Sequence, residues 1–153
     1  MSEDHLWDLG RHTALQHLRR VSVGRLATSH GALPLVVPVN FTLWRDDLVF
    51  AVERDSPLAR ALDGGVFAFE ASGHDEQTER WWSVIVRGQA SLAEDSHPAR
   101  SDIAELGLEV PCQAVLGSSS LVRGAEVASL LALPALSAHL TRPAAPPTNA
   151  ASD

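Results

Sequence analysis

The stretch WSVIVRGQASLA, residues Trp82–Ala93, decides the fold, because it carries the clearest periodic pattern in the chain. Apolar or small residues occupy every second position from Trp82 to Leu92, and most of the positions between them are polar. Successive side chains of a strand point to opposite faces, so this alternation predicts a strand with one continuous apolar face. We therefore expect Trp82–Ala93 to lie in the centre of a sheet.

Four shorter runs precede this strand, and each is rich in apolar or β-branched residues and bounded by turn-forming residues. They are Val23–Ser29, Leu33–Leu43, Leu48–Val52 and Val66–Ala71. A turn-like His-Gly-Ala at 30–32 and a polar break at 44–47 separate the first three runs, which predicts three strands in meander order. The polar residues 72–80 predict a loop before the central strand.

Beyond Pro111 the pattern is weaker. Residues 117–120 are turn-like, and the apolar residues 121–133 fit either a strand or a helix. We expect a last strand over Leu121–Val127. From Arg142 onward the mixture of proline, alanine and polar residues lacks the apolar content to fold. Residues 1–141 are therefore expected to form one domain, and residues 142–153 a disordered tail.

Three segments predict helices around these strands. Leucines at near-helical spacing indicate an amphipathic helix over Leu6–Arg20. Ser56 followed by Pro57 is the signature of a second helix start, and the glycine pair at 64–65 ends that helix. Ser96 and Pro98 predict a third helix that runs to residue 108. Short strands with helices between only some of them favour a mainly β fold, an antiparallel barrel with flanking helices.

The composition excludes several classes of function. The 19 acidic and 12 basic side chains give a formal net charge of −7, which repels nucleic-acid backbones. No apolar run approaches the roughly 18 to 20 residues that cross a bilayer, and no secretory signal pattern occurs. The single cysteine, Cys112, cannot form an internal disulfide. We therefore expect a cytoplasmic protein with no nucleic-acid or membrane partner.

All 12 basic residues are arginine, so a cationic site must use arginine, and neither a lysine Schiff base nor a lysine general base is available. His12 and His17 are the closest pair among the seven histidines, but their spacing places them on different helix faces, and we expect no metal site. The chain has no glycine-rich phosphate loop and no serine in a nucleophile elbow, which leaves hydrolase chemistry without support.

Four phrases of the sequence occur in a familiar order. They are VGRLAT at Val23–Thr28, VPVNF at Val37–Phe41, LVF at Leu48–Phe50 leading into SPL at Ser56–Leu58, and WSVIVRG at Trp82–Gly88. Together they resemble the pyridoxamine-phosphate-oxidase-like FMN-binding split barrels, and among these the nitroimidazole-resistance-like flavoproteins of bacteria. The resemblance covers about residues 9–95. It implies an antiparallel split β-barrel that works as a homodimer.

The resemblance also implies where a flavin lies. In the family, FMN sits at the dimer interface, its ring rests against the strand with the proline-valine pair, and its phosphate lies near the start of the helix after the third strand. Carried over to this chain, the ring contacts are Pro38, Val39, Asn40 and Phe41, the phosphate contact is Ser56, and the residues that close the site are Trp82 and Ser83.

This chain departs from the family at two phosphate-contact positions. Pro57 stands where the family usually has a lysine, and Val52 stands where it has a threonine or serine. We expect Arg54 and Arg60, which flank the same helix start, to act as substitutes. Arg25 in the first strand is a further candidate for contact with the flavin phosphate or a ring carbonyl.

Each of these residues also has a role that needs no ligand. Arg25 can be a solvent-facing strand residue, and Arg54 and Arg60 can be solvated or paired with neighbouring acids. Asn40 requires a hydrogen-bond partner, which can be the flavin edge or a backbone group. Trp82 and the tryptophan before it point to opposite faces, so we expect one in the core and the other at a ligand or partner subunit.

The resulting hypothesis is an FMN-dependent oxidoreductase with the flavin at a homodimer interface. The flavin carries the electrons, so no side chain is required as an acid or base. The sequence does not name the small-molecule substrate or the electron donor. The alternative is a non-catalytic dimeric binding or regulatory protein of the same fold that holds no flavin, or a protein that binds a deazaflavin coenzyme. The missing lysine and threonine at the phosphate positions favour the flavin-free protein, whereas the anionic tail of a deazaflavin coenzyme favours a basic groove that this acidic chain does not indicate.

Overall fold

The computed structural model describes residues 9–108 and 112–126 of the chain. Its helices and strands, in chain order, are α1 (Arg11–Leu18), β1 (Val23–His30), β2 (Leu33–Trp44), β3 (Asp47–Glu53), α2 (Pro57–Leu62), β4 (Val66–Asp75), β5 (Arg80–Leu92), α3 (Ala99–Glu105) and β6 (Cys112–Glu126). The tail predicted for residues 142–153 lies outside the described residues, as do the first residues of the predicted N-terminal helix.

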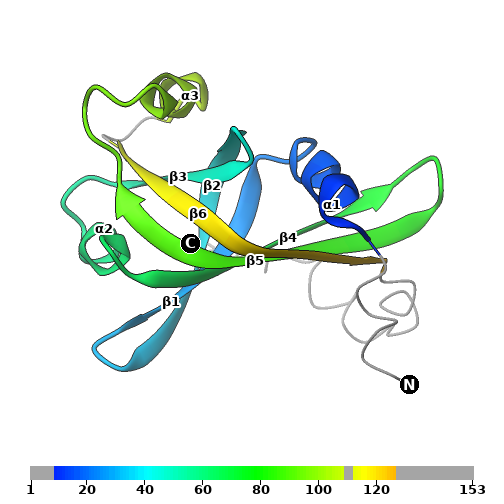
Figure 1. The fold of residues 1–153 in the computed structure, drawn as a ribbon, viewed down its shortest axis with the longest axis horizontal. Coiled ribbons are helices and arrows are strands. Elements are labelled where there is room, and N and C mark those ends of the chain that lie inside the picture. The colour runs from blue at the N-terminus through cyan, green and yellow to red at the C-terminus, as the bar shows by residue number, and fades with distance from the viewer. Residues whose placement is uncertain (1–8, 109–111, 127–153) are drawn as a thin grey trace, which may run out of the picture.

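Six strands in the described residues close into an antiparallel barrel in the order β1-β2-β3-β6-β5-β4 (Figure 1). The first three strands form the predicted meander. The last strand, β6, lies between β3 and β5, and the barrel closes where β4 pairs with β1. The antiparallel barrel predicted from the sequence is therefore confirmed, and the alternating stretch forms the long strand β5 within it.

The barrel interior holds the largest apolar side chains. Phe41, Phe50 and Phe69 are each at most 1% exposed, and the ring centroids of Phe41 and Phe69 lie 4.7 Å apart in an edge-to-face arrangement. Such aromatic pairs stabilise a core beyond the area they bury. Helix α2 contributes Ala59 and Leu62 to the same cluster, so it packs against the barrel interior.

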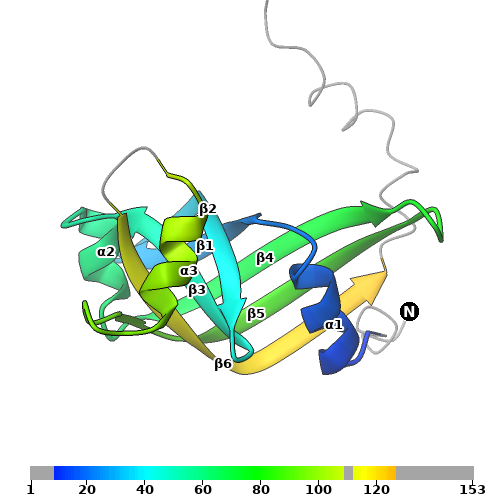
Figure 2. The same ribbon diagram turned by 90° about the horizontal axis from the view of Figure 1, so that it is seen from above.

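Helix α3 covers part of the outside of the barrel. Strand β3 is buried on both faces, because Leu48 and Phe50 point into the barrel while Val49 and Ala51 pack in the cluster that α3 covers. Helix α1 packs against β5 and β6 (Figure 2), and its buried residues Ala14, Leu15 and Leu18 join the core cluster of the barrel interior. The outer surface of β1 and β4, with the adjoining parts of β2 and β5, faces none of the described helices.

Two loops predicted from the sequence are wrong. The polar residues 72–80 belong mostly to strands, since β4 continues to Asp75 and β5 begins at Arg80, and this hairpin extends past the barrel (Figures 1 and 2). Strand β6 runs without a break through the predicted turn at 117–120. Gly117 makes room for aromatic rings instead of making a turn, because an added Cβ would lie 2.8 Å from atoms of both Phe50 and Phe67.

The three predicted helices are confirmed in place, but α1 and α3 start differently from the prediction. Leu9 pairs with β6 and Gly10 is extended, so α1 begins later than the leucine spacing predicts. Helix α2 begins as predicted, with Ser56 as its N-cap and proline in the first turn. At α3 the predicted serine cap is wrong, because the backbone N–H of Ala99 donates to Nδ1 of His97 instead, at 3.1 Å.

Candidate functional site

The outer surface that no described helix covers is the candidate site, and we call it the open face. Its outward side chains include Arg25, Ala27, Val36, Pro38, Asn40, Val66, Ala68, Glu70, Ser83, Ile85 and Arg87. They point outward because they alternate along the strands with residues that point into the barrel. The open face exposes apolar side chains: Val36 is 64% exposed and Val66 is 75% exposed. Exposed apolar surface of this kind marks an interaction or ligand site.

A polar row crosses the open face. Arg25 on β1 lies directly opposite Glu70 on β4, and Nη1 of Arg25 is 3.5 Å from Oε2 of Glu70. The hydroxyl of Ser83 on β5 donates to the other carboxylate oxygen of Glu70 at 3.1 Å. Arg25 also pairs in register with Pro38 on β2. The Glu70 carboxylate on β4 thus contacts side chains of both neighbouring strands, β1 and β5.

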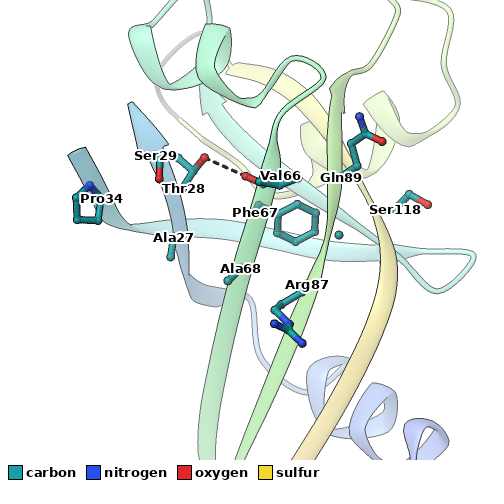
Figure 3. A pocket seen from close by; sticks show the side chains of 11 residues that line it. Ala27, Thr28, Ser29, Pro34, Val66, Phe67, Ala68, Arg87, Gln89 and Ser118 are labelled. Atoms are coloured by element: carbon teal, nitrogen blue, oxygen red, sulfur yellow. Dashed lines mark hydrogen bonds between the residues drawn. The ribbon is translucent and has the colours of Figure 1, made fainter. Parts of the chain in front are cut away.

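A groove of about 870 Å³ adjoins this row. It forms because β1 pairs with β4 only over Arg25–Ala27, and the β1–β2 hairpin then diverges, with the Thr28 hydroxyl donating to the carbonyl of Val66 at 3.1 Å (Figure 3). Its described lining residues are Ala27, Thr28, Ser29, Pro34, Val66, Phe67, Ala68, Arg87, Gly88, Gln89 and Ser118. Its volume falls within the roughly 300–1,000 Å³ typical of small-molecule sites.

The structure divides the residues predicted to contact a flavin ring. Arg25, Pro38, Asn40 and Ser83 lie on the outer surface of the barrel, where they are exposed or half-buried. The side chains of the three other predicted residues point into the core: Val39 and Trp82 are at most 5% exposed and Phe41 is 1% exposed. These three can present only their backbone to a ligand on the outer surface.

The residues predicted to contact the phosphate lie around α2, where their polar groups already have partners in the chain. Nη1 of Arg54 donates to Oε1 of Gln113 at 3.2 Å, and Nη1 of Arg60 donates to the carbonyl of Asp55 at 2.7 Å. The Ser56 hydroxyl oxygen accepts the N–H of residue 59 at 3.1 Å as the helix cap. Val52 is buried in the barrel and cannot reach a ligand outside it.

The adjacent tryptophans point to opposite faces, as predicted. Trp82 is the core member, and its ring stacks on His17 of α1 with centroids 4.8 Å apart. Trp81 is 36% exposed and packs near His74 with ring centroids 5.2 Å apart. Trp81 lies on the hairpin that extends past the barrel, away from the residues that line the groove.

Sequence reasoning missed Glu70 and Arg87 as site residues. Arg87 stands in the alternating stretch in phase with Ser83, so its outward direction was readable from the pattern. Glu70 gave no comparable signal, because its partners Arg25 and Ser83 are brought to it only by the pairing of β4 with both β1 and β5.

Two ionisable groups away from the groove have shifted pKa values. The backbone N–H groups of Gln77 and Thr78 donate to Oδ1 of Asp75, at 2.9 and 3.3 Å, and with nearby Arg20 they lower the pKa of this carboxyl. Burial, and then the charge of Glu53, raise the pKa of the Cys112 thiol.

Two searches of the described residues concern other kinds of site. No three His, Cys, Asp or Glu side chains in residues 9–108 and 112–126 gather closely enough to hold a metal ion. Within the same ranges, no helix has the length and apolar character that a membrane span requires.

Comparisons with known proteins identify the family. A family model described as Pyridoxamine 5'-phosphate oxidase matches residues 10–128, which include the whole barrel, whereas no curated protein matches the chain. Among solved structures, the chain is similar to the FAD binding protein from Mycobacterium smegmatis, with 25% identity, coverage of 78% of this chain and 95% of that chain, and a TM-score of 0.61.

Two further structures are similar in fold. One is an FAD-binding protein from Mesorhizobium loti, with 20% identity, coverage of 77% and 93%, and a TM-score of 0.62. The other is a candidate 5-nitroimidazole antibiotic resistance protein from Bacteroides thetaiotaomicron, with 12% identity, coverage of 78% and 85%, and a TM-score of 0.61. The family match and the shared barrel lead to one conclusion: this chain belongs to the pyridoxamine 5'-phosphate oxidase-like split-barrel family.

Proposed function

We propose that this chain is a flavin-dependent oxidoreductase that works as a homodimer and holds FMN at the open face. One observation carries the proposal: in a protein of this family, a groove of about 870 Å³ opens beside exposed valines and an arginine paired with Glu70, on a barrel surface that α1, α2 and α3 leave bare. The similar proteins from M. smegmatis and M. loti are described as FAD-binding, which supports a flavin as the ligand and makes FAD the competitor to FMN.

The residues of the open face fit a flavin ring. Pro38 and the exposed valines offer apolar contact to a flat ring, and the half-buried Asn40 offers an amide to its polar edge. Arg25, which pairs with Glu70, offers a cation to the ring edge. The flavin, when bound, supplies the electron transfer, and the protein binds it, orients it and keeps water from it.

A homodimer explains why the apolar side chains of the open face are exposed in a single chain. A twofold interface uses the same surface on both subunits, so dimer formation covers Val36 and Val66 of each subunit. The partner also turns the open groove into a closed cleft, where a ligand loses more of its contact with water. The small-molecule substrate or electron donor then reaches the flavin from this shared cleft.

A second candidate is a flavin-free or deazaflavin-binding dimeric protein with a binding or regulatory role. It is favoured by the helix start at α2, where proline and the buried Val52 replace the family's phosphate contacts and both nearby arginines hydrogen-bond to the chain itself. In that case the open face binds a different molecule or only the partner subunit.

One purification distinguishes these candidates. The full chain is purified without added cofactor, its visible absorption is recorded, and any chromophore released on denaturation is identified by mass. The apoprotein is then titrated with FMN, FAD and a deazaflavin coenzyme. A yellow protein that releases FMN, or an apoprotein that binds FMN more tightly than the other two, supports the proposal. Colourless protein that refuses both FMN and FAD rejects it in favour of the second candidate.

A further inference from the structure

The groove contains a single charged side chain among its described lining residues, that of Arg87. The remaining polar lining residues are neutral: they are the hydroxyl residues Thr28, Ser29 and Ser118 and the amide residue Gln89. No carboxylate belongs to this described lining, although the chain as a whole carries a net charge of −7. The Thr28 hydroxyl already donates to the carbonyl of Val66, but the Arg87 guanidinium and the hydroxyl groups of Ser29 and Ser118 can donate hydrogen bonds to a ligand, which favours an anion.

Arg87 lies close to the polar row formed by Arg25, Glu70 and Ser83. Arg87 pairs in register with Ala68 on β4, and Ala68 stands two residues from Glu70. Two residues of a strand span about 7 Å, so the Arg87 row and the Arg25–Glu70 row are neighbours on the same face. Figure 3 shows Arg87 level with Ala68 on the next strand. One extended ligand can therefore touch the polar row with one part and Arg87 with an anionic part.

The region around α2 is less suited than the groove to bind a phosphate. Its arginines donate to Gln113 and to the carbonyl of Asp55, and the hydroxyl of Ser56 is engaged as the helix cap. The helix itself is six residues long. An arginine guanidinium has five N–H donors, so Arg54, Arg60 and Arg87 each retain donors for a ligand. The preference for the groove therefore rests on the engaged hydroxyl of Ser56, on the shortness of the helix and on the groove lining that contains no carboxylate.

We infer that the groove binds the phosphate of the flavin nucleotide, with Arg87 as the cation that recognises it. This inference rests on the proposed flavin function and moves the phosphate from the start of α2 to the strands β1, β4 and β5. The ring then lies over the polar row. The hydroxyl groups of Ser29 and Ser118 add neutral donors at the rim of the groove.

Riboflavin provides the test, because it has the ring of FMN without the phosphate. Dissociation constants for FMN and riboflavin are measured by quenching of flavin fluorescence for the wild-type chain and for Arg87→Met, Arg87→Lys, Arg54→Met and Arg60→Met. We expect Arg87→Met to weaken FMN binding about tenfold or more, which corresponds to about 1.4 kcal/mol, and to change riboflavin binding less than about twofold. Arg87→Lys should retain part of the FMN affinity, and the Arg54 and Arg60 variants should keep the wild-type preference for FMN.

Each other outcome overturns the inference in a recognisable way. An unchanged FMN affinity in Arg87→Met leaves the flavin function standing and removes the phosphate from the groove. A selective loss of FMN in Arg54→Met or Arg60→Met places the phosphate at α2. Equal losses of FMN and riboflavin in Arg87→Met, with an unchanged circular dichroism spectrum, show that Arg87 acts on the ring or the barrel. A wild-type chain that binds neither flavin overturns the proposed function itself.

Discussion

Replacing Val66 with aspartate tests whether the open face is a dimer interface. Val66 is 75% exposed in the single chain, and burying a whole valine side chain contributes about 1.5–3 kcal/mol. Covering three quarters of it therefore contributes about 1–2 kcal/mol, and a twofold dimer buries it twice, which doubles the figure to about 2–4 kcal/mol. At about 1.4 kcal/mol per factor of ten, we expect the dimer to dissociate about 30- to 700-fold more readily. Aspartate adds the cost of burying a charge, so these figures are lower bounds.

The assay is sedimentation equilibrium over a concentration series, with Ala104→Asp as the matched control. Ala104 is exposed on α3, which packs over a different part of the barrel, so its variant adds the same charge away from the open face. We expect dimers for the wild type and the control, monomers for Val66→Asp, and a folded circular dichroism spectrum for all three. If FMN lies between the subunits, Val66→Asp also loses bound FMN. A wild-type chain that is monomeric at every concentration, or a Val66→Asp chain that associates as tightly as the wild type, refutes the reasoning.

Two further predictions concern stability. Gly117→Ala should lower the free energy of unfolding by about 1–3 kcal/mol in urea titrations, because its Cβ meets the rings of Phe50 and Phe67 at 2.8 Å; Gly10→Ala, which meets no atom within 4 Å, is the control, and an equal effect of the two changes would contradict the packing argument. Asp75→Asn should destabilise the chain near neutral pH and lose its effect in acid. The folded state lowers the pKa of Asp75 below its usual value of 3.8, so the ionised carboxylate stabilises the fold above that pH and ceases to do so as the pH falls through the folded-state value. Urea unfolding of both chains across this pH range measures the difference, and a difference that persists unchanged at low pH would rule out the charge as its cause.

The strands were predictable from the sequence wherever a strand has one apolar face or is wholly apolar. The alternation that begins at Trp82 gave β5, and the apolar run Leu48–Val52 gave β3, which is buried on both faces. The predictions were wrong where the side chains of a strand are polar because they face water. The ends of β4 and β5 form such a hairpin, and their backbone groups pair with each other whatever their side chains are. At Gly117, a residue typical of turns is required by ring packing inside a continuous strand.

The candidate site was less predictable than the fold, because its polar contacts depend on how the barrel closes. Arg25, Glu70 and Ser83 come from three strands, and only the register of β4 against β1 and β5 brings them into contact. The family resemblance directed attention to the strand with the proline-valine pair, where alternate side chains turn into the core and leave the ligand face to their neighbours. It also directed the phosphate to α2, although the same alternation places Arg87 on the face that the helices leave open. A closed sheet therefore lets a sequence identify outward positions strand by strand, while the set of outward positions that forms one site depends on pairings between distant strands.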